Sequence, residues 1–470
     1  MTAAPSTARS ITRETEADRH SILPLTRDLC AFNTGVVADG NELLFSRLQQ
    51  ELPFRVHRYA SGSEHNGWVV PGNWRVERAT IERDGVRIYD GTVHPLGVAM
   101  NSKSFAGTLD WEELNKHLVS SPALPDAHMF HSVWHIRSWA ADWALCLPHR
   151  IHRQMGPGKY RVDLATSFAG GEMLVGEYEH RGRSDQVILF NTNNCHPTQA
   201  NDGFAASALL VRLFQWLQTQ DTYYTYRLII APEHLGSTFY MRDRSVDEVE
   251  RMVSCVFAEM PGNRDPLTIA STFLGGQALD MAFRNAARHY SRGFKLAEWR
   301  QGCGNDETVW EAPGHEIPTV EFTRARDPNY PYAEYHSSDD NPDLMDPVYL
   351  TEFHDVLQRV VQTFENNAVV HRHFDGLICL SNPSYDLYFE RHDPTIDKGL
   401  SDDDERWGRL LDSLFRYFDG SLSLLEIAER HQLPFDKLRR YVERFQQKGL
   451  VSLTFAHIHR PTLTRRRQRS

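Results

Sequence analysis

The chain has 470 residues, of which 41% are hydrophobic and 24% charged, with a formal net charge of −11 at pH 7. This length exceeds what one hydrophobic core usually holds, so we expect two or three domains. The acidic balance argues against broad binding of nucleic-acid phosphates. No apolar run approaches the length of a membrane span, the first twenty residues lack the apolar core of a signal peptide, and the six cysteines are scattered. These features predict a cytoplasmic protein with reduced thiols and no membrane partner.

The N-terminal part of the chain predicts a catalytic domain with an insert. Residues 1–20 are polar without an apolar period, and we expect them to be disordered. Residues 21–52 carry a short helical pattern that begins the catalytic domain. From 53 to 147 short alternating strands predominate, and Asp84-Gly85 between two of them is typical of a hairpin turn. Catalytic-domain sequence lies on both sides, so 53–147 is predicted to be an inserted β-rich domain.

The catalytic domain is predicted to resume at residue 148 and to continue to 375. Its predicted strands are 161–165, 187–192, 226–231, 254–258 and 317–321. Helical patterns alternate with these strands, which is typical of an α/β sheet with helices on both faces.

The most informative segment, residues 195–203, follows strand 187–192 and precedes a helical period. Its His196 and Asp202 therefore lie between the C-terminal end of a strand and the start of a helix. Ligands and metals bind at this position in open α/β sheets. An imidazole and a carboxylate there suit a divalent metal such as zinc. The alternative is that Asp202 caps the helix and His196 fills a turn.

Two further segments contribute acids and imidazoles. Strand 226–231 leads into Glu233 and His234, and a polar loop downstream carries Glu334 and His336. With the first pair, these segments can supply three metal ligands and a general base, the minimum for a catalytic zinc centre. Glu233 is our candidate for the base, because an acid at a strand exit is held more rigidly than one in a long loop. Glu334 is the rival for that role.

Three residues are weaker candidates for the site. Asp306 lies in a glycine-containing loop region, where it either contacts the active site or a substrate amine, or is a solvated loop acid. His234 and Arg324 are candidates for stabilising an oxyanion.

The C-terminal part has a different character. Residues 376–456 predict three short helices and a strand, which is typical of a winged helix. The third helix, 435–447, is basic, and a basic tail follows at 457–470. Asp436 and Glu443 interrupt the basic face and the chain is acidic, so DNA binding is not favoured. We expect contact with the catalytic domain, a second copy of the chain or a biosynthetic partner protein.

Over residues 22–455 the chain resembles a bacterial family of aminopeptidase-like proteins. Members have a zinc-exopeptidase domain, a β-rich, jelly-roll-like insert and a C-terminal winged helix. The resemblance is carried by Cys-His-Pro…Ala-Asn-Asp at 195–202, Pro-Glu…Gly-Ser at 232–237 and Tyr-His-Ser-Ser at 335–338. It implies hydrolysis of a peptide or amide bond, with His196, Asp202 and His336 as zinc ligands.

The resemblance also implies a biosynthetic role and a number of zinc ions. Family members are often found among polysaccharide or specialised-metabolite biosynthesis genes, so the expected substrate is a peptide or an amide-containing small molecule. Dinuclear relatives in the wider group carry paired acids where this chain has Glu233-His234, and an aspartate after the next strand, where this chain has Glu259. One zinc ion is therefore favoured over two. The alternative function is a non-catalytic regulator that binds a partner or DNA through its winged helix.

Overall fold

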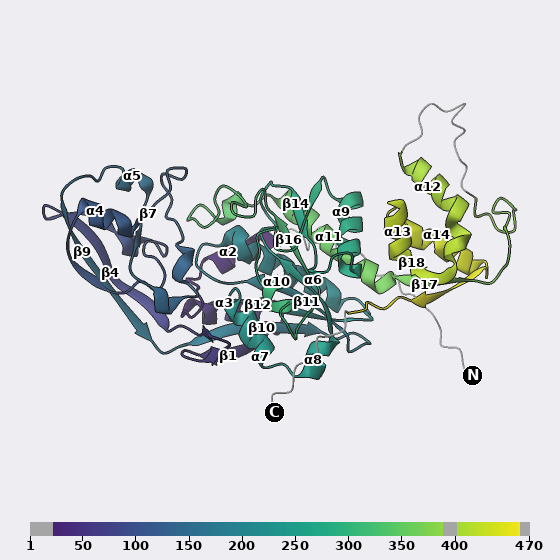
Figure 1. Cartoon of the computed structure of the whole chain (residues 1–470), viewed down its shortest axis with the longest axis horizontal. Coiled ribbons are helices and arrows are strands. Elements are labelled where there is room, and N and C mark those ends of the chain that lie inside the picture. Colours follow the sequence, from purple (N-terminus) through teal and green to yellow (C-terminus); the bar gives the residue numbers. More distant parts are fainter. Residues whose placement is uncertain (1–21, 389–401, 461–470) are drawn as a thin grey trace.

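Figure 1 shows a computed structural model of the chain, which describes residues 22–388 and 402–460. Residues 1–20, which we expect to be disordered, and most of the basic tail lie outside these ranges. A central domain occupies the middle of the molecule, with the β-rich insert at one end and the C-terminal module at the other. No helix within the described ranges is long and apolar enough to cross a membrane.

The central domain is built on an eight-stranded mixed sheet in the order β1-β10-β12-β11-β13-β16-β14-β15. The strands are β1 (Arg55–Ala60), β10 (Glu172–His180), β11 (Val187–Asn193), β12 (Thr225–Ala231), β13 (Met252–Ala258), β14 (Leu267–Ala270), β15 (Phe294–Ala297) and β16 (Thr319–Arg324). Strands β12, β11, β13 and β16 run parallel. Every residue of β11 is buried, as expected for an inner strand covered on both faces. The four predicted strands from 187 to 321 are confirmed.

Helices cover both faces of the sheet, as predicted. One face packs against α2 (Ile22–Cys30), α3 (Gly40–Leu48), α6 (Ala205–Gln218), α9 (Ala278–Tyr290) and α11 (Pro347–Asn366). The other packs against α7 (Leu235–Arg242), α8 (Val246–Arg251) and α10 (Glu307–Trp310). Alternation along β11 divides its side chains between the two cores: Ile188 and Phe190 face the first, Val187 and Leu189 the second.

The insert lies between β1 and β10 and contains one four-stranded antiparallel sheet, in the order β5-β4-β9-β6. Its strands are β2 (Glu64–His65), β3 (Trp68–Val69), β4 (Asn73–Arg83), β5 (Val86–Asp90), β6 (Phe105–Asp110), β7 (Leu118–Val119), β8 (Leu145–Cys146) and β9 (Lys159–Ala169). Its short helices are α4 (Trp111–Leu114), α5 (His149–His152) and the 3₁₀ turns Gly91–Val93, Asn115–His117, Ser132–Trp134 and Ser138–Ala140. The predicted hairpin turn is confirmed, because Asp84 and Gly85 join β4 to β5 with φ values of 50° and 75°.

The predicted boundaries of the insert, 53 and 147, need correction. Strand β9, predicted at 161–165 in the catalytic sheet, pairs instead with β4 and β6 of the insert. Strand β1, which falls within 53–147, pairs with β10 at the edge of the central sheet. The insert therefore spans about residues 61–171. The insert has one four-stranded sheet and the two-stranded pairs β2-β3 and β7-β8, whereas a jelly roll packs two larger sheets together.

The C-terminal module has three helices and a three-stranded antiparallel sheet in the order β18-β17-β19. Its elements are β17 (Ala368–Arg372), α12 (Asp402–Ser413), the 3₁₀ turn Leu414–Tyr417, β18 (Asp419–Ser423), α13 (Leu424–His431), α14 (Phe435–Gln447) and β19 (Val451–Phe455). The three predicted helices and the final strand are present. The module begins before the predicted residue 376, because β17 lies between β18 and β19 in its sheet.

Candidate metal centre and active site

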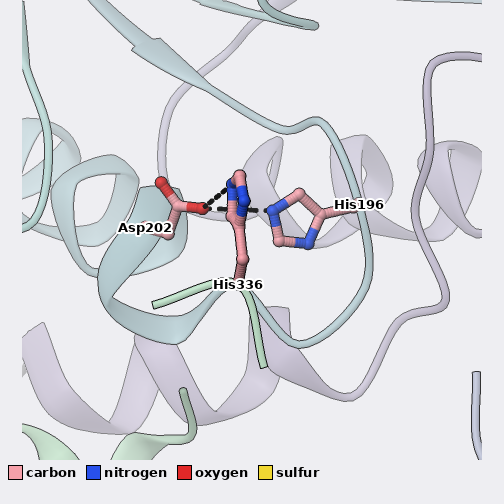
Figure 2. Close-up of side chains that lie close together, drawn as sticks. All are labelled: His196, Asp202 and His336. Carbon is pink, nitrogen blue, oxygen red and sulfur yellow. Dashed lines mark hydrogen bonds and ion pairs between the residues drawn. The ribbon is translucent and has the colours of Figure 1, made fainter. Parts of the chain in front are cut away.

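His196, Asp202 and His336 lie together at the carboxyl end of the parallel strands (Figure 2). The first two come from the loop between β11 and α6, and His336 comes from the long loop after β16. Asp202 Oδ2 is 3.1 Å from His196 Nε2 and 3.5 Å from His336 Nε2. His196 and Asp202 are buried, and His336 is half-buried. Two imidazole nitrogens and a carboxylate converging in this way form a donor set that fits zinc.

The β11–α6 loop is shaped to present its two side chains. Gln199 Oε1 accepts hydrogen bonds from the backbone N–H groups of Cys195 and His196, both at 2.7 Å. A kinked turn, Ala200–Phe204, then leads into α6. At Gly203 a Cβ atom would lie 2.1 Å from Gln199 Nε2, so only glycine allows this approach. The Asp202 carboxylate faces the imidazoles instead of capping α6, which removes the capping alternative.

Two residues that no sequence pattern indicates connect the loops of His196 and His336. Asp340 accepts hydrogen bonds from the backbone N–H groups of Asn201 (2.8 Å) and Asp202 (3.2 Å). Phe130 stacks on the His196 ring with centroids 3.9 Å apart, and its N–H donates to the His336 carbonyl at 2.7 Å. Asp340 stands four residues after His336, but nothing in that spacing distinguishes it from its neighbour Asp339. Phe130 carries no local signal at all.

Glu233 follows β12 and lies beside His196, Asp202 and His336. Its Oε1 is 3.2 Å from His234 Nδ1, and its Oε2 is 3.8 Å from His135 Nε2. Burial alone would raise the pKa of Glu233, but the paired His234 side chain and the nearby His135 and His336 rings lower it to about 2. The carboxylate is therefore ionised at neutral pH. Its backbone N–H donates to Cys195 Sγ at 3.1 Å, which connects the two strand exits.

His234 and Asp306 support the Glu233 turn. His234 has a left-handed backbone with φ of 54°, and its N–H donates to Asp306 Oδ1 at 2.5 Å. The Ser237 hydroxyl donates to the other Asp306 oxygen. Burial raises the pKa of Asp306 to about 6. Burial would lower the pKa of His234, but Glu233 and Asp306 outweigh it and raise that pKa to about 9. Asp306 is thus a buried partner of this turn, and the solvated-acid alternative is wrong.

Arg324 and Glu334 do not join the group. The buried Arg324 guanidinium pairs with Glu352 and donates to the carbonyls of Pro261 (3.1 Å) and Asp265 (3.0 Å). The prediction that Arg324 stabilises an oxyanion is wrong, because Glu352 and the backbone carbonyls already accept its N–H groups. Glu334 is half-buried, and its side chain makes no hydrogen bond or ion pair with the residues that the structure describes.

A cavity of about 460 Å³ lies between the central domain and the insert. The segment 33–40 lines one side and the segment 71–76 of the insert lines the other. His135 and Pro197 also line it. His135 contacts Glu233 and Pro197 follows His196, so the cavity reaches the candidate site.

Comparison with known proteins agrees with this architecture. Residues 24–367 match the family described as Domain of unknown function (DUF4910), and the chain belongs to this family. A Clostridium acetobutylicum protein, provisionally named a polysaccharide biosynthesis protein with aminopeptidase-like domain, is 24% identical over 355 residues, which cover 75% of this chain and 79% of that protein.

Two solved structures share the fold. A provisionally assigned peptidase from Clostridium acetobutylicum has a TM-score of 0.76 at 21% identity, covering 93% of this chain and 97% of that one. A zinc aminopeptidase from Bacillus subtilis has a TM-score of 0.56 at 13% identity, covering 75% of this chain and 95% of that one. The central domain therefore has an aminopeptidase-like α/β fold.

Proposed function

We propose that this member of the DUF4910 family is a zinc-dependent, peptidase-like hydrolase that cleaves a peptide or amide bond. The observation that carries the proposal is the convergence of His196, Asp202 and His336, with the ionised Glu233 beside them. Mixed nitrogen and oxygen donors favour zinc over calcium or magnesium, which prefer oxygen ligands alone. A zinc ion held by these three residues would supply Lewis acidity to the scissile carbonyl and to water.

Glu233 is proposed as the proton carrier. Because its carboxylate is ionised at neutral pH, it can accept a proton from the attacking water and return it to the leaving amine. His234 is the remaining candidate for steadying the oxyanion, since its raised pKa of about 9 keeps the ring positively charged at neutral pH. Asp306 holds the turn that carries both residues.

The substrate is proposed to be a peptide or an amide-containing small molecule from polysaccharide or specialised-metabolite biosynthesis. The cavity of about 460 Å³ beside the site is within the size range of small-molecule pockets. The Clostridium acetobutylicum relative is named for polysaccharide biosynthesis and an aminopeptidase-like domain. This name supports a substrate from a biosynthetic pathway.

The C-terminal module is proposed to be a winged helix that docks on the central domain. Glu429 of α13 pairs with Arg284 and with Arg288 of α9, the latter at 2.6 Å. Asn285 of α9 accepts the N–H of Phe435 at the start of α14, at 3.0 Å. These contacts place the N-terminal end of the basic helix against α9, which supports docking over DNA binding.

The basic side chains of α14 are also partly neutralised within the helix. Arg440 pairs with Asp436 at 3.2 Å, and Arg439 pairs with Glu443 at 2.9 Å. Such pairing leaves less charge for phosphate contacts. A sequence-specific DNA footprint with steep salt dependence would instead favour the regulator.

Hydrolysis can be tested without knowing the natural substrate. The zinc-loaded protein is incubated with mixtures of peptides, aminoacyl amides and N-acyl amino sugars, and products are identified by mass spectrometry. We expect cleavage of at least one amide class, and loss of that product with Glu233→Gln. Products that form equally with both proteins would refute the assigned chemistry, and a wild type inactive on every class would favour the regulator.

A further inference from the structure

A second group of side chains that could hold a metal lies in the core beside the His196 centre, because Asp202 and Glu233 act electrostatically on Glu259. Glu259 directly follows β13, Cys303 lies in the loop before α10, and Glu321 belongs to β16. One ligand atom of each lies within 4.8 Å of the others. The two glutamates are 0% and 1% exposed. The group shares no residue with the set of His196, Asp202 and His336.

The loop before α10 is fitted closely to the Glu321 carboxylate. Glu321 Oε1 accepts the Cys303 N–H at 2.5 Å, and Oε2 accepts the Gly304 N–H at 3.2 Å. At Gly302 a Cβ atom would lie 2.4 Å from the same carboxylate, so a glycine is required for this approach. The backbone thereby holds the Cys303 thiol next to the two acids.

The group has buried oxygens that no protein donor satisfies. Glu259 Oε1 and Asn305 Oδ1 have no hydrogen-bond partner among the described residues, although Asn305 is only 8% exposed. The Asn305 amide nitrogen donates to Glu259 Oε2 at 3.3 Å, so the Asn305 side chain lies beside the group. A buried polar atom without a partner is costly, and such atoms usually mark a missing water or ion.

The charge of Arg300 offsets only part of the effect of burial on the pKa of Glu321. Within residues 22–388 and 402–460, neither Glu259 nor Glu321 forms an ion pair with a lysine, arginine or histidine. The nearby Arg300 is instead 3.5 Å from Glu307. Two adjacent buried carboxylates therefore need a proton or a bound cation between them.

We propose that Glu259, Cys303 and Glu321, with the Asn305 side-chain oxygen, form a second metal site that takes a zinc-type transition ion. A thiolate selects such ions over magnesium and calcium, and carboxylates are the oxygen ligands that zinc accepts. On binding, the Cys303 thiol releases its proton to solvent, and the thiolate becomes a ligand. The site goes beyond the proposed hydrolysis and does not depend on it.

Metal content tests the site directly. Protein stripped with a chelator, reloaded with zinc and desalted is analysed by mass spectrometry of the metal. We expect two zinc ions per wild-type chain, and one in Cys303→Ser and in Glu321→Gln. The matched control is Cys379→Ser, which changes an exposed thiol and should retain both ions. One ion in the wild type that both site variants retain would overturn the proposal.

Cobalt provides a readout that identifies the thiolate. With two equivalents of Co²⁺, the wild type and Cys379→Ser should show a sulfur-to-cobalt charge-transfer band, and Cys303→Ser should not. The band should persist in His196→Ala with Asp202→Ala, which distinguishes this site from the catalytic one. Circular dichroism checks the fold of each variant. If a site variant does not fold, the wild-type spectrum still decides, because a missing charge-transfer band would refute a thiolate ligand.

Discussion

At the scale of single residues, neighbouring charges determine which buried acids are ionised. Burial disfavours the ionised form of both Glu233 and Glu177, yet hydrogen bonds and positive neighbours lower the pKa of each to about 2. In Asp306 burial prevails and the pKa rises to about 6. The first two acids are therefore carboxylates at neutral pH for the same physical reason. Glu233 is our proposed proton carrier, and we expect Glu177 to stabilise the fold.

Glu233→Gln should lower hydrolysis by ~10²–10⁴-fold, because the amide cannot accept the proton of water. Zinc content and thermal stability should change little, since the amide is similar in shape. Steady-state kinetics on any cleaved amide measures the effect. Glu334→Gln is the control and should be silent. If Glu334→Gln is the damaging change instead, the two roles have been exchanged.

Glu177→Gln tests the pH dependence of stability. Burial would raise the pKa of Glu177, but the hydrogen bond from His57 and the charge of Arg227 lower it from 4.5 to about 2. A lowered pKa gives stability that is present above the unfolded pKa and is lost as pH falls toward the folded one. At neutral pH the variant should lose roughly 2–3 kcal/mol of unfolding free energy.

The difference between Glu177→Gln and wild type should shrink as pH falls below 4.5 toward 2, because the wild-type carboxylate then becomes protonated. Urea unfolding across this range measures it. Glu179→Gln is the control, because Glu179 pairs with the same Arg227 but its side chain is 33% exposed. A constant difference at all pH values would show that the ionised form of Glu177 is not what stabilises the fold.

At the scale of elements, the candidate site lies at the carboxyl ends of parallel strands. The patterns at 187–192 and 226–231 predict β11 and β12 almost to the residue. Since parallel neighbours end at the same edge, the nearness of Glu233 to His196 and Asp202 follows from sequence. The motif resemblance adds His336, whose long loop has no periodicity that would place it.

Other features could not be predicted, because they depend on contacts between distant segments. The apolar alternation of β9 is equally consistent with the central sheet and with the sheet of the insert. Its pairing with β4 and β6 assigns it to the insert. Asp340 is recognised only through its bonds to the loop that carries Asp202. Arg324 resembles a site residue in sequence, yet it forms a buried ion pair with Glu352, which lies on a later helix.

Asp340→Ala should loosen the connection between the two ligand loops. Its carboxylate accepts the N–H groups of Asn201 and Asp202, so its loss leaves Asp202 less well oriented. Removing such a supporting partner typically costs ~10–100-fold in metal affinity. Competition with a zinc chelator measures this. Asp339→Ala, at the neighbouring position, should leave affinity unchanged; equal effects of both variants would rule out a specific role for Asp340.

At the scale of the whole molecule, three units share extensive contacts. The insert and the central domain enclose the cavity beside the site. The C-terminal module shares one hydrophobic core with the central domain. Leu425 and Leu438 of the module belong to the same buried cluster as Phe283 of α9. We therefore expect the module to unfold together with the central domain.

Glu429→Ala should weaken the docking of the module. The Glu429 side chain is 7% exposed and pairs with both Arg284 and Arg288, so its removal should cost roughly 1.5–3 kcal/mol. Urea unfolding followed by tryptophan fluorescence measures the loss. Glu443→Ala, which removes a pair within α14, should cost only about 0.5 kcal/mol. Equal losses would contradict the docking contact.

His196, Asp202 and His336 are proposed to hold a zinc ion. Zinc content per chain, measured by mass spectrometry in a Cys303→Ser background, tests this proposal most directly because that background removes the second proposed ion. We predict one zinc ion in the background protein and none after His196→Ala with Asp202→Ala, with circular dichroism unchanged. A folded variant that keeps its full zinc content would contradict the assignment of these residues as the metal centre.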